Sequence, residues 1–179
     1  MHLAINGFFL DKPTTGTGQY TRQLLQAIAE GWPHRLSVLL PSGCDVSLLP
    51  TRSEHVTYHV LPPPFGSACL SGRQAQDKPF GGNLGKVWFE QIDVPRAAAK
   101  LGADILHVPY LGAPLRCSLP VVVTVHDLLQ LTVPQLRGGP LVRLYNLLVV
   151  AGARRAAAIL ADSEYTRETV LAHLRVPPQ

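Results

Sequence analysis

The chain has 179 residues, of which 46% are hydrophobic and 16% are charged. This length allows one domain with a sizeable core, and the composition is typical of a soluble globular protein with large buried elements. No stretch approaches the roughly 20 apolar residues of a membrane-spanning helix, and the N-terminus lacks the basic region of a signal peptide. The net charge of +4 forms no dense basic stripe, so no nucleic-acid partner is expected.

The three cysteines, Cys44, Cys69 and Cys117, share no close spacing. Their number and spacing argue against a disulfide framework and against a zinc site. The sequence therefore indicates a reducing, cytoplasmic compartment and no bound metal.

The first part of the chain predicts three strands and one helix. Residues 3–9 form a short apolar run that is typical of a first strand. A turn-rich loop follows, with Thr17 as the expected N-cap of a helix over residues 18–30, where apolar residues recur every four positions. Residues 35–41 and 55–62 predict the next two strands.

The middle of the chain predicts a long loop, then helix and strands. Residues 62–83 lack periodicity and are rich in proline, glycine and polar residues, so we expect a flexible loop of the kind that is usually functional or disordered. Residues 84–102 have a helical pattern, in which Pro95 should kink the helix or begin a second one. Residues 103–109 and 120–126 predict two further strands.

The last part of the chain predicts a helix, a strand and a helix. Residues 140–157 form a long amphipathic pattern, and residues 158–163 form a short apolar one. The final helix is expected over residues 163–175, with Ser163 as its N-cap. The proline-rich residues 176–179 are typical of the start of an interdomain linker.

Continuous apolar strands that alternate with helices predict a mostly parallel sheet with helices on both faces. The expected fold class is α/β, a Rossmann-like, doubly wound domain over residues 1–175. The sequence shows no internal repeat and no second core.

Ligands of such sheets bind beyond the carboxyl ends of the strands. Gly16-Thr17-Gly18 is expected there, at the start of the first helix, whose free N–H groups suit a phosphate. The dinucleotide pattern G-x-G-x-x-G is incomplete because residue 21 is Thr. A plain tight turn is therefore an equal alternative.

His126 and Asp127 directly follow the β-branched run 121–125. A histidine there can exchange hydrogen bonds with a ligand, and a neighbouring carboxylate can orient its ring. In the alternative interpretation, His126 bonds a loop carbonyl group and Asp127 is the N-cap of the next helix. Position in the fold favours a functional His126 and a capping Asp127.

Other motifs of catalysis are absent or unsupported. The chain has no D-x-D pair for a metal-bound nucleotide and no G-x-S-x-G nucleophile elbow. His55 and His59 have no third metal ligand nearby in the sequence. Glu90 and Asp93, one helical turn apart, are expected on a solvated face.

Four segments together resemble the N-terminal half of a family 4 (group 1) glycosyltransferase: NGFFLDKPTTGTGQYTRQLLQAI, GADILHVPYLGAPL, PVVVTVHDLLQLTVP and AAAILADSEYTRETVLAHLRVPP. The resemblance covers nearly the whole chain and is weakest over residues 62–83. It implies one half of a GT-B fold, in which two Rossmann-like domains face each other across a cleft. It also implies retaining transfer of a sugar from a nucleotide-sugar donor, with neither metal nor cofactor.

In such enzymes the N-terminal domain mainly holds the acceptor. For single residues, the resemblance implies donor diphosphate binding by Gly16, Thr17 and Gly18, contact of His126 with the transferred sugar, and acceptor binding by Asp11 and Tyr110. His126 would then make its hydrogen bonds to the sugar. Acceptors in this family are often lipid-linked, so the resemblance also allows peripheral contact with the inner face of the membrane.

One departure from the family concerns its C-terminal domain, which carries two glutamates eight positions apart. No two glutamates of this chain have that spacing. We therefore expect the donor-binding C-terminal domain to be absent and the chain alone to be inactive.

A non-catalytic Rossmann-like module that binds a sugar or an anionic lipid is the alternative from another class. An epimerase or dehydrogenase is disfavoured, because the chain also lacks a Tyr-x-x-x-Lys pair.

Overall fold

The computed structural model describes residues 1–31, 33–49, 54–63, 81–136 and 138–176. In these residues, six parallel strands form one sheet in the order β3-β2-β1-β4-β5-β6. The strands are β1 (His2–Asn6), β2 (Arg35–Leu40), β3 (Val56–Val60), β4 (Ile105–Val108), β5 (Val121–Val125) and β6 (Ala158–Ala161). The α-helices are α1 (Gly16–Gly31), α2 (Gly81–Trp88), α3 (Val94–Lys100), α4 (Leu129–Thr132), α5 (Pro140–Ala153) and α6 (Glu164–Leu174). Two 3-10 turns, η1 (Val46–Leu48) and η4 (Pro134–Leu136), and one π-helix, η3 (Phe89–Asp93), complete the described elements.

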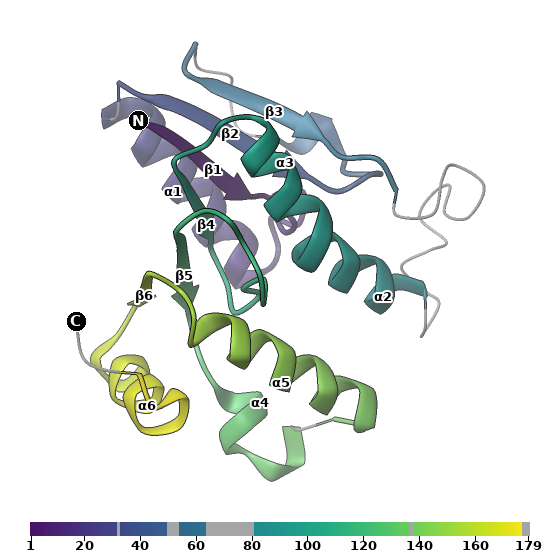
Figure 1. Ribbon diagram of the computed structural model, residues 1–179, viewed down its shortest axis with the longest axis vertical. Coiled ribbons are helices and arrows are strands. Elements are labelled where there is room, and N and C mark those ends of the chain that lie inside the picture. The colour runs from purple at the N-terminus through teal and green to yellow at the C-terminus, as the bar shows by residue number, and fades with distance from the viewer. Residues whose placement is uncertain (32, 50–53, 64–80, 137, 177–179) are drawn as a thin grey trace.

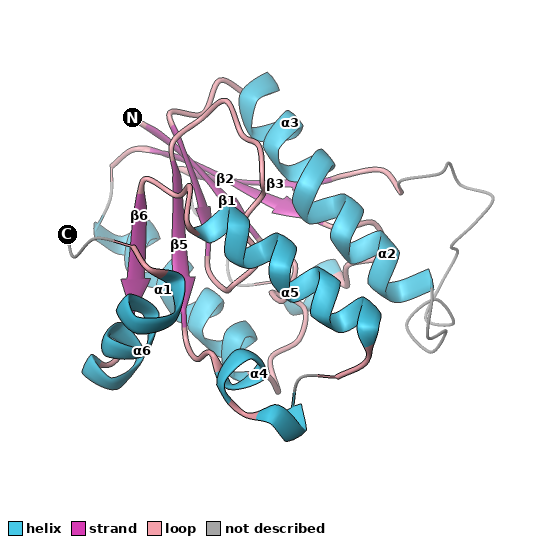
Figure 2. Ribbon diagram, turned by 60° about the horizontal axis from the view of Figure 1, so that its bottom comes forward, coloured by secondary structure: helices cyan, strands magenta, loops and turns pink. Residues whose placement is uncertain are grey.

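Helices cover both faces of the sheet (Figures 1 and 2). The chain steps from β1 to β2 in one direction and from β5 to β6 in the other. Right-handed connections therefore place α1 on one face and α3 and α5 on the opposite face. The predicted α/β, doubly wound, Rossmann-like fold is confirmed, and it is consistent with one half of a GT-B fold. None of the helices in the described part of the chain is long and apolar enough to cross a membrane.

The core has two parts, one on each face of the sheet. Successive residues of a strand point to opposite faces. One set from β1 and β2 packs with Leu25 of α1: Leu3, Ile5, Leu36, Val38 and Leu40. The other cluster lies on the opposite face. It joins the strand residues Ala4, Leu39, Leu106 and Val123 to Phe89 of η3, Val94 and Ala98 of α3, and Val150 of α5. Burying one such large aliphatic side chain contributes about 2 kcal/mol, so this alternation fixes the register of the sheet.

The first helix begins two residues earlier than predicted, and its cap is Thr15 rather than Thr17. Thr15 Oγ1 accepts the N–H of Gly18 at 3.1 Å, and the same hydroxyl group donates to the Lys12 carbonyl oxygen at 2.9 Å. Thr17 lies inside the first turn. The prediction placed the cap wrongly because several Thr residues precede the apolar pattern, and each suits the position.

Most of the predicted loop 62–83 lies outside the described residues, at 64–80. Its last three residues, 81–83, belong to α2. Of the expected linker 176–179, only Val176 is described. The short elements α4, η1 and η4 were not predicted, because three or four residues are too few to show a period.

One continuous helical path runs from α2 through η3 to α3, with Pro95 in the first turn of α3. Proline has no N–H, so the usual bond to the carbonyl group four residues earlier is lost. The preceding turn is π-helical, with the N–H of Val94 bonded to the carbonyl oxygen of Phe89. Of the two outcomes expected for Pro95, the structure shows the start of a second helix, joined to the first by η3.

A chain of polar side chains is buried between the sheet and α1. His107 Nε2 lies 2.9 Å from Thr124 Oγ1, which lies 3.3 Å from the Tyr20 hydroxyl group. Burial lowers the pKa of His107 to about 4. The ring is therefore neutral at pH 7 in the folded chain.

The stability of the chain should fall as the pH drops from about 6.5 to about 4. In that window the unfolded chain protonates His107 but the folded chain does not, so the unfolded state binds more protons. At pH 4.5 this group alone should cost on the order of 2 kcal/mol. Urea unfolding at pH 7 and pH 4.5 measures the change in the free energy of unfolding, and the His107→Gln variant should lose less of it between these two pH values. An equal loss in both proteins would contradict the assignment.

Gly18→Ala should destabilise the chain, whereas Gly16→Ala should not. A Cβ atom at residue 18 would lie 2.1 Å from the Lys12 carbonyl oxygen and 2.8 Å from that of Phe9. A Cβ atom at residue 16 meets nothing within 4 Å. We expect Gly18→Ala to lose about 2 kcal/mol or more through this clash, and Gly16→Ala to be neutral or slightly stabilising. Thermal unfolding followed by circular dichroism compares the pair, and equal Tm values would contradict the clash.

Candidate functional site

A cavity of about 220 Å³ lies at the carboxyl ends of the strands. Its walls come from the loop after β1, the first turn of α1, the segments after β4 and β5, and helices α2 and α5. The lining residues used below are Phe9, Thr17, Lys86, Tyr110, His126, Asp127 and Tyr145. The cavity therefore brings together Thr17, Tyr110 and His126, three of the residues identified from the sequence.

His126 directly follows β5, and 23% of its side chain is exposed. Its Nδ1 lies 3.0 Å from Asp162 Oδ2, after β6, and its Nε2 lies 3.0 Å from the Pro109 carbonyl oxygen, after β4. The ring also meets that of Tyr20 edge to face, with centroids 4.7 Å apart. The expected bond to a loop carbonyl group is present, but the orienting carboxylate is Asp162 rather than Asp127.

The two partners of the His126 ring are both acceptors when Asp162 is ionised. Each ring nitrogen of His126 thus has a hydrogen-bond partner within the domain. We expected these bonds to go to a sugar, whereas both ring nitrogens are already bonded within the domain. A ligand can reach His126 through its exposed ring edge or by replacing Asp162, whose side chain is 42% exposed.

Asp127 is exposed, and its Oδ1 accepts the N–H of Leu129 at 3.1 Å. This N–H belongs to the first residue of α4, but the N-cap residue of that helix is Leu128, so the prediction that Asp127 is the N-cap is wrong by one residue. Leu128 lies between Asp127 and the helix. The Asp127 carboxylate also lines the cavity.

Thr17, in the first turn of α1, lines the same cavity. An α-helix leaves its first N–H groups without acceptors inside the helix. The N–H of Gly18 is taken by Thr15 Oγ1, and that of Gln19 by the Thr15 carbonyl oxygen. No acceptor among the described residues binds the N–H groups of Gly16 and Thr17, and the positive end of the helix dipole favours an anion near them. Gly18, by contrast, is buried and serves close packing.

The far wall of the cavity is held by a buried carboxylate that the sequence analysis had placed on a solvated face. Glu90 is fully buried. Lys86 Nζ lies 2.6 Å from Glu90 Oε1, and the Tyr145 hydroxyl group donates to Glu90 Oε2 at 2.9 Å. Lys86 also donates to Tyr145. Burial raises the pKa of the Glu90 carboxyl group, and Lys86 opposes this.

Tyr110 is buried beside this network. Burial, and then the charge of Glu90, raise the pKa of the Tyr110 hydroxyl group well above its usual range. The ring packs edge-on against Phe9, with centroids 4.9 Å apart. Gly112 makes room for it, because a Cβ atom there would lie 2.2 Å from the Tyr110 ring. A neutral hydroxyl group on a fixed ring is suited to hydrogen bonding rather than to proton transfer.

Asp11 does not line the cavity. Its Oδ2 accepts the N–H of Asp45 at 3.4 Å, and its charge adds to burial in raising the pKa of the Cys44 thiol to about 12. Asp11 therefore joins the loops after β1 and β2. The neighbouring Lys12 ammonium group lies 4.5 Å from the centroid of the Phe8 ring.

Lys86, Glu90 and Tyr145 are the residues of this site that the sequence analysis missed. The spacing of four between Lys86 and Glu90 was the available signal, since it places both on one side of a helix. Among the described residues, no three His, Cys, Asp or Glu side chains gather where they could hold a metal ion.

Comparison with known proteins adds the family. A search of curated proteins found no match. The family model of Glycosyltransferase Family 4 matches residues 14–179, which is most of the chain. All the residues that line the cavity at the carboxyl ends of the strands, except Phe9, lie within the matched region. The chain therefore belongs to glycosyltransferase family 4 and carries the N-terminal domain of that family.

Proposed function

We propose that the chain is the acceptor-side domain of a retaining, metal-independent glycosyltransferase that uses a nucleotide-sugar donor. The observation that carries this proposal is the cavity in which the first turn of α1, Tyr110 and His126 meet. Family membership supports sugar transfer, and the cavity supplies groups suited to a sugar and a diphosphate. No cofactor takes part in the proposed reaction, and the donor is a co-substrate.

The donor diphosphate would bind at the start of α1. The N–H groups of Gly16 and Thr17 and the positive end of the helix dipole attract an anion there. Gly18 would support this site by allowing the turn to pack closely on the loop 9–12. The His126 ring, which packs against Tyr20 of α1, would lie next to the position proposed for the transferred sugar.

The acceptor would lie along the wall formed by Tyr110, Lys86 and Tyr145. The Lys86 ammonium group is already paired with Glu90, and the Tyr145 hydroxyl group is bonded to both, so this wall offers ring faces rather than a free charge. Such surfaces suit a sugar or another polyhydroxyl group. Asp11, which lies outside the lining, would act on acceptor binding by holding the loop that carries Phe9.

A lipid-linked acceptor is favoured by exposed leucines on α5. Leu141, Leu144 and Leu147 are 61%, 64% and 67% exposed, and Leu84 of the adjacent α2 is 63% exposed. Apolar side chains that gather on a surface favour contact with a lipid or protein surface. We therefore propose a cytoplasmic enzyme that touches the inner face of the membrane peripherally.

The 179-residue chain alone should not transfer sugar. The glutamate pair and the basic residues of the family's C-terminal domain are absent from this sequence. Residues 1–179 and a longer protein containing them would be incubated with radiolabelled nucleotide-sugars and lipid-linked acceptors. Transfer by the longer protein only is expected. Transfer by residues 1–179 would contradict the division of the site, and specific sugar or lipid binding without transfer by either protein would favour the non-catalytic module.

In the complete enzyme, His126→Ala should lower kcat on the order of 100-fold, because the sugar loses a positioning contact. His55→Ala is the matched control, since His55 is exposed at the start of β3 and paired only with Glu54 among the described residues. Steady-state kinetics measure both variants, and circular dichroism verifies that each is folded. A kcat for folded His126→Ala equal to that of His55→Ala would contradict the role of His126.

A further inference from the structure

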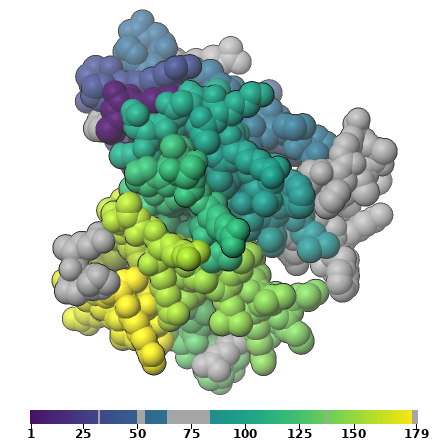
Figure 3. All heavy atoms as spheres, in the orientation of Figure 1, coloured from purple at the N-terminus to yellow at the C-terminus, as the bar shows by residue number. Residues whose placement is uncertain are grey.

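A second pocket lies near the amino ends of the strands, at the end of the sheet opposite the first cavity. It surrounds Val121, the first residue of β5, whereas His126 directly follows the last residue of that strand. Five strand residues span about 16 Å, so the two pockets are well separated. The segment between β4 and β5 passes between α3 and the C-terminal end of α5 on this face (Figures 1 and 3).

This amino-edge pocket, as we call it, has a volume of about 630 Å³, which suits a small molecule. Three arginines from three different elements line it. Arg96 comes from α3, Arg116 from the segment before β5, and Arg155 from the residues after α5. We propose that the amino-edge pocket binds a compact phosphorylated anion, at a site separate from that of the donor.

The charge of the lining favours an anion. Among its described residues none is acidic, and none of the three guanidinium groups forms an ion pair in the described part of the chain. Asp93 interacts electrostatically with Arg96, but its Oδ1 is bonded to the indole N–H of Trp88 at 3.1 Å. Three positive charges around one hollow therefore have no fixed counter-charge in its walls.

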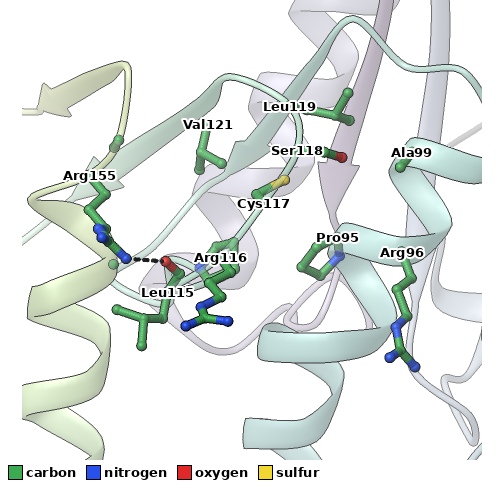
Figure 4. Close-up of a pocket in the computed structure, with 13 residues that line it drawn as sticks. Pro95, Arg96, Ala99, Leu115, Arg116, Cys117, Ser118, Leu119, Val121 and Arg155 are labelled. Carbon is green, nitrogen blue, oxygen red and sulfur yellow. Dashed lines mark hydrogen bonds between the residues drawn. The ribbon is translucent and has the colours of Figure 1, made fainter.

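The side chains determine which anion fits. One guanidinium group can donate two parallel hydrogen bonds to the oxygens of one phosphate group, which makes arginine the preferred residue for phosphate recognition. The described lining contains no aromatic ring on which a nucleobase or a sugar could stack. Pro95, Cys117 and Leu119 line the pocket between the arginines (Figure 4). A small, strongly charged group, such as pyrophosphate or a phosphorylated metabolite, matches this lining better than a nucleotide does.

The walls are fixed before any ligand binds. Gln91 clamps the segment, because its Nε2 donates to the Ala113 carbonyl oxygen at 3.1 Å and its Oε1 accepts the N–H of Leu115 at 2.8 Å. Gly152 lets α5 pack closely on the segment, since a Cβ atom there would lie 2.4 Å from the same Ala113 oxygen.

Of the three arginines, Arg155 is hydrogen-bonded to the wall of the pocket, whereas Arg96 and Arg116 are described by the direction of their side chains. Arg155 is held by a bond from its Nη1 to the Leu115 carbonyl oxygen at 3.3 Å. In Figure 4 the side chains of Arg96 and Arg116 extend in the same direction from the two sides of the pocket. Fixed walls and a hydrogen-bonded Arg155 reduce the entropy that the pocket loses when it binds a ligand.

The test is isothermal titration calorimetry, which measures the Kd of the 179-residue chain for pyrophosphate at about 0.15 M ionic strength, where non-specific attraction is screened. The double variant Arg96→Gln/Arg116→Gln should weaken binding at least about tenfold, as expected for lost charge-assisted bonds. Arg35→Gln/Arg143→Gln removes two exposed arginines elsewhere and is the matched control; it should stay within about threefold of the wild type. Thermal unfolding verifies that both variants fold.

Amide chemical shifts in NMR spectra locate the ligand. Shifts at Arg116, Cys117 and Ser118 are expected, and shifts confined to Gly16 and Thr17 would overturn the proposal. An absence of pyrophosphate binding, or an equal loss in both double variants, would overturn it as well. Sedimentation with phosphatidylglycerol vesicles separates the two sources of phosphate. Vesicle binding without pyrophosphate binding would assign the arginines to a membrane surface instead.

Discussion

The ion pair between Glu90 and Lys86 is the interaction on which the candidate site depends. Glu90 is fully buried, and a buried carboxylate is costly unless it is paired and hydrogen-bonded. Lys86 and Tyr145 bind it directly, and Tyr110 lies beside it. These three partners all line the cavity. One carboxylate therefore sets the positions of a wall that is built from α2, α5 and the segment after β4.

The opposite wall depends on the parallel sheet itself. Because β4, β5 and β6 are adjacent and parallel, the residues that follow them meet at one edge. Pro109, His126 and Asp162 each follow one of these strands, and the His126 ring connects the other two. The Thr166 hydroxyl group of α6 donates to the His126 carbonyl oxygen at 2.9 Å, which fastens the end of β5. A histidine at the end of a dry strand is thus stabilised by its neighbours.

The sequence predicted those parts of the structure that depend on local pattern. The six strands, the main helices and the Ser163 cap follow from apolar period and capping chemistry, and Ser163 Oγ accepts the N–H of Thr166 as expected. Contacts between distant segments were not predictable in this way. Asp162 lies 36 residues after His126, and Tyr145 lies 55 residues after Glu90. Glu90 was assigned to solvent because nothing in its own helix indicates that α5 covers it.

The π-helix η3 explains how one helical path can serve two pockets. A π-turn contains an extra residue, so side chains on either side of it point in directions that a regular α-helix would not combine. Glu90 of η3 holds the cavity at the carboxyl edge, and Gln91, the next residue, clamps the segment that lines the amino-edge pocket. Pro95 removes one helical hydrogen bond just beyond this turn, and α3 then carries Arg96 into the second pocket. Pro95, which interrupts the helical pattern in the sequence, therefore lies between the residue that holds the first cavity, Glu90, and the arginine that lines the second, Arg96.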